Sequence, residues 1–246
     1  MHILLTNDDG ISAYGLTVLE NLARPFASKI TIVATAENQS GTGRSISLHK
    51  DIAFRQLAVD RYEVGGTPAD CVMMAMNLLF KDNKPDLVLS GVNHGMNVGD
   101  DVGYSGTVGA AFEAAIHLVP AIAISQQHAR EEADFEPASS FGPMALEYAL
   151  SVSIPPRAVL NINMPGKNNG KVSGIRKACL DTHKFCDEIF EGSQPDSFRI
   201  GPLVTKPEML AQSDRYWLEQ GFISMTMLTM DANDSVHTNN LTNTDF

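Results

Sequence analysis

The sequence has no long uninterrupted run of apolar residues, and it is poor in cysteine. Its nearest approach to such a run, Val119 to Ile124, contains Pro120 and is far shorter than the roughly 18 residues that a transmembrane helix needs. We therefore expect no membrane span. There are three cysteines, and no basic and then apolar leader stands ahead of the first predicted strand. Both features favour a cytoplasmic protein over a disulfide-bonded secreted one.

Positive charge is also scarce. The chain has 18 Lys and Arg residues against 29 Asp and Glu residues, which gives a formal net charge of -11. Such a balance argues against a protein that binds nucleic-acid polymers or anionic membranes, so we expect small partners. An anionic substrate would need local neutralisation by a metal ion or by the N-terminus of a helix.

Strand and helix patterns alternate over the first part of the chain. Strands are expected at residues 2–6, 29–34, 86–90, 121–125 and 158–162, with an additional hairpin or edge extension up to about residue 64. Helices are expected between them, including one from Pro68 to about Phe80 with Thr67 as its N-cap and one from about Phe141 to Val152. This alternation predicts an α/β fold with a mainly parallel, doubly wound sheet covered on both faces.

The pattern loosens after Met164. A short strand is expected near residues 171–175, irregular structure at 177–207, a helix at 208–220 and a final strand at 222–230. At 246 residues the chain is long enough for one large domain. We divide it into a core of about residues 1–165, a C-terminal extension and arm at about 166–235, and a frayed tail at 236–246.

Two adjacent carboxylates, Asp8 and Asp9, follow the first predicted strand directly. In open α/β sheets, ligands gather beyond the carboxyl ends of the strands, where this pair would lie. A hard divalent cation between the two anions would relieve their repulsion. The alternative is an exposed Asn-Asp-Asp-Gly turn, because short polar residues and glycine suit turns.

Polar, glycine-containing segments follow two further strands and would reach the same edge of the sheet. Ser40 would supply a hydroxyl and Asn93 an amide oxygen, which together with the two carboxylates make an oxygen-rich set suited to Mg²⁺ or Mn²⁺. A helix that begins at Ser105, Gly106 and Thr107 would present backbone N–H groups and hydroxyls to a phosphate group. A metal beside a phosphate seat predicts phosphoester hydrolysis.

Other polar side chains allow two interpretations each. His94 could protonate a leaving oxygen or merely line the pocket. Asn97, Asp100 and Asp101 could orient the ligands or cap the loop. The spacing of Cys179, His183 and Cys186 resembles half of a zinc site, but we expect no metal there because no credible fourth ligand lies nearby.

Five ordered motifs within residues 1–165 resemble those of the stationary-phase survival protein SurE family. They are L-L-T-N-D-D-G, N-Q-S-G, G-T-P-A-D-C-V, S-G-V-N-x-G-x-N-x-G-D-D-V and Y-S-G-T-V-G-A-A, with a weaker match at S-D-R-Y-W-L-E-Q-G-F-I-S-M-T. The resemblance implies a metal-dependent 5′/3′-nucleotidase with one Mn²⁺ or Mg²⁺ per subunit. It also implies a Rossmann-like three-layer core and a C-terminal arm exchanged within a homodimer, which in some members pairs into a tetramer.

The resemblance further implies which residues act at the site. Asp8, Asp9, Ser40 and Asn93 match the metal ligands of the family, and Ser105 to Thr107 match its phosphate-contacting turn. Asp8 and Asp9 are the candidate catalytic residues, with Asp8 in the more direct role of general base or nucleophile, and Asn93 is expected to contact the phosphate as well. The expected substrates are nucleoside 5′- and 3′-monophosphates, with short-chain polyphosphate as a further one.

The sequence departs from the family pattern at some positions. Tyr14 and Met227 stand where the family usually has proline, and the segment from Cys186 to Ile200 lacks the usual Asp-Pro-Arg-Gly stretch. Two other classes of protein fit the sequence less well than a nucleotidase does. A phospho-accepting receiver domain needs a third strand-end Asp, where this chain has Asn93. A zinc deacetylase needs histidine beside the first carboxylates, and the first turn has none.

Overall fold

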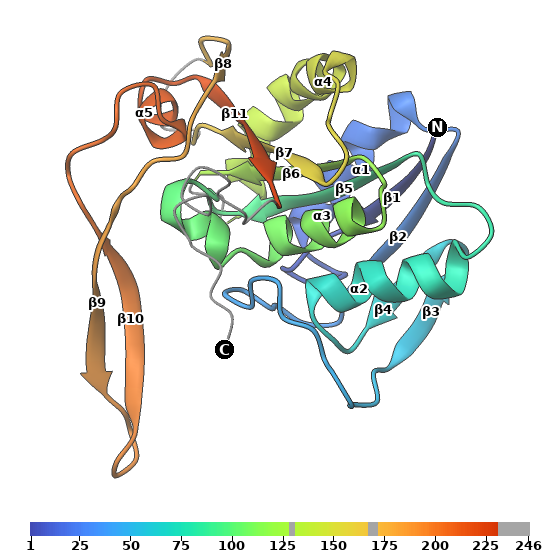
Figure 1. Cartoon of the computed structure of the whole chain (residues 1–246), viewed down its shortest axis with the longest axis horizontal. Coiled ribbons are helices and arrows are strands. Elements are labelled where there is room, and N and C mark those ends of the chain that lie inside the picture. Colours follow the sequence, from blue (N-terminus) through green and yellow to red (C-terminus); the bar gives the residue numbers. More distant parts are fainter. Residues whose placement is uncertain (128–130, 167–171, 231–246) are drawn as a thin grey trace, which may run out of the picture.

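The computed structural model of the chain describes residues 1–127, 131–166 and 172–230. Among these residues, nine strands join in one sheet. They are β1 (His2–Thr6), β2 (Lys29–Thr35), β3 (Phe54–Ala58), β4 (Arg61–Val64), β5 (Leu87–His94), β6 (Ala121–Gln126), β7 (Ala158–Met164), β8 (Ile175–Lys177) and β11 (Ile223–Thr229). The order across the sheet is β3-β4-β2-β1-β5-β6-β7-β11-β8 (Figure 1).

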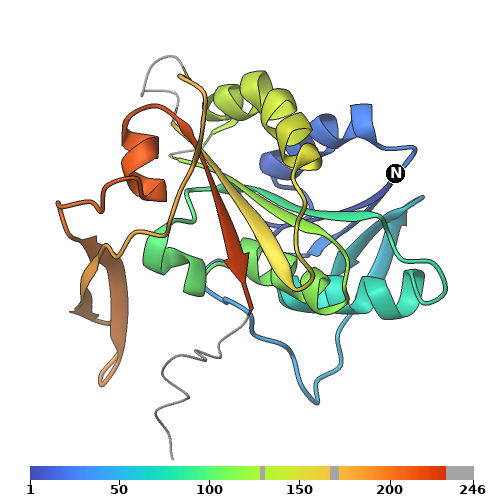
Figure 2. The same cartoon turned by 45° about the horizontal axis from the view of Figure 1, so that its top comes forward.

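Helices cover both faces of this sheet, as the alternating pattern predicted (Figures 1 and 2). One face carries α1 (Tyr14–Ala23) and α4 (Glu136–Ser151), and the other carries α2 (Pro68–Met74) and α3 (Gly106–Ile116). The six strands from β4 to β7 run parallel, whereas β3 is antiparallel to β4 and β11 is antiparallel to β7. The predicted three-layer α/β fold with a mainly parallel sheet is therefore confirmed.

Each face of the sheet has its own buried apolar cluster, because successive side chains of a strand point to opposite faces. On β1, Leu4 packs with the α2 and α3 side while Leu5 packs with the α1 and α4 side, and both are fully buried. Strands buried on both faces read as continuous apolar runs, which is why the central strands were recognisable from sequence.

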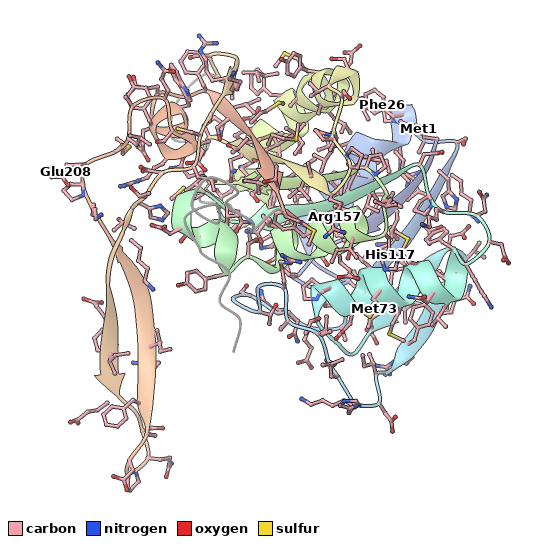
Figure 3. The ribbon with its side chains drawn as sticks, viewed as in Figure 1. Met1, Phe26, Met73, His117, Arg157 and Glu208 are labelled. Atoms are coloured by element: carbon pink, nitrogen blue, oxygen red, sulfur yellow. The ribbon has the colours of Figure 1, made fainter. Side chains whose placement is uncertain are left out.

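The region after β7 differs from its predicted form. Residues 177–207 were expected to be irregular, but they contain β9 (Lys184–Glu191) and β10 (Phe198–Thr205), which pair as an antiparallel hairpin. The hairpin projects away from the main sheet (Figures 1 and 2). Its side chains extend without a facing layer from this chain (Figure 3), and Phe198 and Ile200 are 71% and 73% exposed.

Two helix boundaries were also wrong. The helix expected at 208–220 is the short α5 (Asp214–Glu219), because Gln212 takes a left-handed φ of 63° and Ser213 then caps the new helix by accepting a hydrogen bond from the Tyr216 amide. Helix α4 begins at Glu136 rather than near Phe141. The tail at 236–246 lies outside the described residues.

The order of the strands reverses at β1. Strand β1 lies between β2 and β5, so the chain moves to one side of β1 first and to the other side later. In open α/β sheets, the ligand crevice lies beyond the carboxyl ends of the strands at such a point, where the strand order reverses. The segments that follow β1, β2 and β5 meet there, together with the first turn of α3.

The two apolar clusters should carry the stability of the fold. Ile122 on β6 is fully buried, so Ile122→Ala should lower the free energy of unfolding by about 2–5 kcal/mol through lost burial and a cavity. Val59, between β3 and β4, is 86% exposed, and Val59→Ala should change stability by less than about 0.5 kcal/mol. Urea unfolding of both variants measures the contrast, and equal losses would contradict this view of the core.

Candidate functional site

The turn after β1 is buried although it carries two carboxylates. Asp8 is 3% exposed, and Asp9 beside it is partly buried. The Asn7 side-chain amide donates a 2.8 Å hydrogen bond to the Gly10 carbonyl, and Gly10 takes a left-handed φ of 111° that closes the turn. The alternative of an exposed turn is therefore wrong, because the fold buries Asp8 and partly buries Asp9.

Asp8 lies directly against the N-terminus of α3. The Thr107 hydroxyl donates a 2.5 Å hydrogen bond to Oδ1 of Asp8. Gly106 permits this approach, since a Cβ at that position would lie 2.9 Å from both Cβ and Oδ2 of Asp8 and 3.0 Å from Cγ of Pro68. The positive end of the helix thus faces a carboxylate.

Burial governs the protonation of this carboxylate. Loss of solvation raises the pKa of Asp8 from 3.8 to about 6, the Thr107 hydrogen bond opposes the rise, and the charge of Asp9 adds to it. Burial also raises the pKa of Asp9, while His94 partly offsets that effect. Two buried carboxylates of raised pKa, side by side, favour a cation as a third partner.

Asp9 joins the ends of two other strands. The backbone amide of His94, at the end of β5, donates a 3.1 Å hydrogen bond to Oδ2 of Asp9. The Asn38 side-chain amide donates at 3.4 Å to Oδ1 of Asp9, and the Oδ1 atom of Asn38 accepts a 2.8 Å hydrogen bond from the Ser40 amide. Through these contacts the segments that carry Ser40 and Asn93 lie next to the acidic pair.

Further hydrogen bonds fix the loop that carries Ser40. The Gln39 amide donates 2.7 Å to the Asp8 carbonyl, and the Gly43 amide donates 2.9 Å to the Tyr104 carbonyl. Downstream, the Ser47 amide donates 3.0 Å to Oδ1 of Asp70. Asp70 and Thr67 form the capping box of α2, so the predicted cap of that helix also anchors the loop.

Asn93 and His94 stand at the carboxyl end of β5. The side-chain amide of Asn93 donates a 2.9 Å hydrogen bond to the Gly95 carbonyl. The Oδ1 atom of Asn93, the acceptor of this side chain, takes no part in that hydrogen bond. The His94 ring packs edge-on against Phe135 at 5.0 Å between centroids, and its Nε2 atom lies 4.0 Å from Oδ2 of Asp9. His94 is therefore held at the site, and its role as a proton donor stays a prediction.

The first turn of α3 is the predicted phosphate seat. Ser105 is its N-cap, and its hydroxyl accepts a 3.1 Å hydrogen bond from the Val108 amide. The amides at the start of a helix have no partner within the helix. That of Thr107 hydrogen-bonds the Asp8 carboxylate. The hydroxyl of Ser105 is used as a cap, and that of Thr107 serves Asp8.

Asn97 is engaged in a buried network with residues of β6 and β7. Its amide donates 2.7 Å to Oδ1 of Asn163, its side chain donates 2.7 Å to the Ser125 hydroxyl, and its carbonyl accepts from the side chains of Asn161 and Asn163. These contacts fix the loop after β5. A part for Asn97 in the pocket itself stays a prediction.

Sequence reasoning did not single out Asn38, Asn161 or Asn163. Asn38 lies in the N-Q-S-G motif two residues before Ser40, and an asparagine so near a proposed ligand is a usable signal. Asn161 and Asn163 alternate along β7, so both face the α3 side of the sheet, and polar residues at buried positions of a strand indicate a network.

The donors at the crevice suit a hard cation. Within the described residues, no group of three or more His, Cys, Asp and Glu side chains could hold a metal. Asp8 and Asp9 would supply only two acidic ligands, so the neutral oxygens of Ser40 and Asn93 would have to complete the set. In the cluster of Cys179, His183 and Cys186, Cys179 is a free exposed cysteine. The Nε2 atom of His183 lies 3.3 Å from Oδ2 of Asp101.

Fold and site together define a class: a doubly wound α/β protein with a buried acidic pair, at the point where the strand order reverses, beside a helix N-terminus. Comparison with known proteins narrows the class. A family model described as Survival protein SurE matches residues 3–187. The chain belongs to the SurE family, which confirms the resemblance drawn from its motifs.

Individual relatives agree along most of the chain. A 5′-nucleotidase SurE of Rhizorhabdus wittichii is 48% identical over 239 residues, and one of Erythrobacter litoralis is 39% identical over 237 residues; each alignment covers 94% of both chains. The crystal structure of the SurE protein from Aquifex aeolicus superposes with a TM-score of 0.85 at 30% identity, covering 98% of both chains. No helix of the described residues is long and apolar enough to cross a membrane.

The contact between α3 and Asp8 leaves no room for a side chain at position 106. Gly106→Ala should therefore lower the free energy of unfolding by about 1–3 kcal/mol and displace Asp8. The matched control is Gly103→Ala, where an added Cβ meets nothing within 4 Å. Urea unfolding compares the two variants, and a Gly106→Ala protein as stable as the control would contradict the geometry.

The raised pKa of Asp8 gives stability a defined pH dependence in chelator-treated protein. The folded state binds the Asp8 proton more tightly than the unfolded state, so the ionised carboxylate destabilises the fold above pH 6. This penalty, about 3 kcal/mol for a pKa raised to about 6, disappears as the pH falls from 6 to about 4. Asp8→Asn should thus be more stable than wild type at pH 8.

Urea unfolding at pH 8 and at pH 4.5 measures this difference. We expect the advantage of Asp8→Asn to shrink at the lower pH, with Asp82→Asn, an exposed loop position ahead of β5, as the control for loss of one carboxylate. An advantage of the same size at both pH values would show that burial does not act on the ionisation of Asp8.

Proposed function

We propose that this protein hydrolyses nucleoside 5′-monophosphates to nucleoside and phosphate with the help of one divalent cation per subunit, Mn²⁺ or Mg²⁺. The observation that carries the proposal is the buried Asp8 and Asp9 pair set against the N-terminus of α3. Carboxylates suit a cation and a helix N-terminus suits a phosphate, so the two halves of a metal-assisted phosphatase lie together. The names of the relatives, 5′-nucleotidase SurE, supply the substrate class.

Asp8, Asp9, Ser40 and Asn93 would hold the cation. When bound, it would offset the charge of the carboxylates and polarise a phosphoryl oxygen. The Gly106 amide and the positive end of α3 would interact with the phosphate oxygens and stabilise charge as the ester bond breaks. Asp8 would remove the proton of the attacking water or itself attack phosphorus, and His94 would protonate the leaving oxygen.

The proposal extends to 3′-monophosphates and to short-chain polyphosphate. The cation ligands and phosphate-binding groups named above would all contact a terminal phosphate group or its cation, and they lie near the ends of strands and of a helix. A phosphate ester of either position could therefore reach the same donors. Discrimination between bases would come from the rim of the crevice.

We also propose a cytoplasmic homodimer, with tetramers as a further assembly, in which the C-terminal extension acts as the arm. The support is the β9–β10 hairpin, which projects from the main sheet with exposed apolar side chains (Figures 1 and 3). Apolar surface of this kind is typical of association between protein chains. The exposed apolar residues of the hairpin are Ile189, Phe190, Phe198 and Ile200.

Phosphate release from a panel of 5′- and 3′-mononucleotides and tripolyphosphate tests the function. The protein is first treated with chelator, and Mg²⁺, Mn²⁺ or Zn²⁺ is then restored singly. We expect release with Mn²⁺ or Mg²⁺ and a loss of roughly 10²–10⁴-fold in kcat for Asp8→Asn, since a group that acts in the transition state is removed. Asp82→Asn, at an exposed loop position ahead of β5, should keep wild-type activity.

Two results would contradict the proposal. One is full activity of Asp8→Asn, which would remove the acidic pair from the chemistry. The other is a folded, metal-loaded protein that releases phosphate from none of the nucleotides.

A further inference from the structure

The base of the β9–β10 hairpin is attached to the loop that leads into α3. This loop is the 3₁₀ turn η3 (Gly99–Gly103). Oδ2 of Asp100 accepts two backbone hydrogen bonds from the segment where β9 begins, 2.9 Å from the His183 amide and 2.8 Å from the Lys184 amide. The same two amides, that of Lys184 foremost, lower the pKa of Asp100 from its ordinary value, so the carboxylate is held ionised.

Contacts on both sides of Asp100 reinforce this attachment. The His183 ring is 1% exposed, and its Nε2 atom lies 3.3 Å from Oδ2 of Asp101. A Cβ at Gly99 would lie 2.5 Å from Nδ1 of His183, so the two segments touch closely there. The Lys184 ammonium also donates a 3.3 Å hydrogen bond to the Tyr104 hydroxyl. The turn and the base of the hairpin therefore pack as one unit.

The opposite side of η3 contacts the proposed site. Tyr104 directly precedes Ser105, the N-cap of α3. Its carbonyl accepts the 2.9 Å hydrogen bond from Gly43, three residues after Ser40 in the chain. A Cβ at Gly109 would lie 2.2 Å from the Gly43 carbonyl oxygen, so the Ser40 loop also rests on α3 itself. A shift of η3 would thus move the phosphate turn and the Ser40 loop together.

We propose that Asp100 is a positioning residue that fixes the phosphate-binding turn by holding η3 to the base of the hairpin, so that the hairpin and the active site are mechanically coupled. The proposal rests on the proposed function for its effect on catalysis. Its structural part concerns only the contacts of η3. Asp100 touches neither the proposed cation ligands nor the phosphate seat, and it acts through the backbone of residues 101–105.

The test compares Asp100→Ala and Asp100→Asn with the control Asp82→Ala. Asparagine keeps a side-chain oxygen that can accept from both amides, so it should rescue what alanine loses. Amide hydrogen exchange is followed in segments 38–45, 101–109 and 180–186. In Asp100→Ala we expect exchange in all three segments to be roughly tenfold faster, because local opening at η3 spreads to both of its neighbours.

Kinetics give a second, independent readout. In Asp100→Ala we expect KM for a nucleoside 5′-monophosphate, and the inhibition constant of inorganic phosphate, to rise roughly tenfold with a smaller change in kcat, since a loosened phosphate seat weakens binding in ground and transition states alike. Asp100→Asn should recover most of this loss. Asp82→Ala should match wild type in both readouts.

The outcomes separate the inference from the function. Faster exchange confined to 180–186, with 38–45 and 101–109 unchanged, would overturn the coupling whatever the activity. Loss of activity in Asp100→Ala that Asp100→Asn does not restore would also overturn it, because the charge and not the hydrogen bonds would then matter. Coupled exchange in a protein that hydrolyses no nucleotide would support the mechanical link and refute the proposed function.

Discussion

Asp8 and Asp9 are withdrawn from water at the end of the central strand, next to each other in the chain, and the surrounding structure compensates for that burial. Like charges in a poorly solvated place raise the free energy of the fold unless polar groups hydrogen-bond to them. The Thr107 hydroxyl donates a hydrogen bond to Asp8, which also lies at the positive end of α3. The backbone amide of His94 and the side-chain amide of Asn38 donate to Asp9. These contacts come from different segments of the chain, so the acidic pair holds several segments together at the end of β1.

Sequence alone could predict the sheet and its covering helices because the parallel strands are buried on both faces and leave uninterrupted apolar runs. It could also predict that the segments of Asp8, Ser40 and Asn93 lie close together, since each of these residues follows a strand predicted from sequence. The β9–β10 hairpin gave no such signal. Its side chains at residues 188–191 and 198–200 are exposed, so these stretches lack the alternation that marks a half-buried strand.

The contacts that complete the site were beyond sequence reasoning because they join residues far apart in the chain. Thr67 was identified as a helix cap, but the hydrogen bond that its capping-box partner Asp70 accepts from Ser47 depends on how the loop folds back over α2. Asp100 was likewise open to interpretation as a capping residue, and its bonds to His183 and Lys184 span more than 80 positions. The start of the helix predicted at 208–220 was wrong for a local reason, the left-handed backbone of Gln212, which no residue preference indicated.

The hydrogen bond from Thr107 to Asp8 has a thermodynamic consequence. A helix N-terminus that already faces a carboxylate offers a second anion a repulsive neighbour, so a bare phosphate group binds there at a disadvantage. A cation that neutralises Asp8 removes this disadvantage, and by reciprocity a bound phosphate strengthens the hold on the cation by the same factor. On the proposed function, the cation and the phosphate would therefore bind cooperatively, and a phosphate group would bind best once the charge of Asp8 has been balanced.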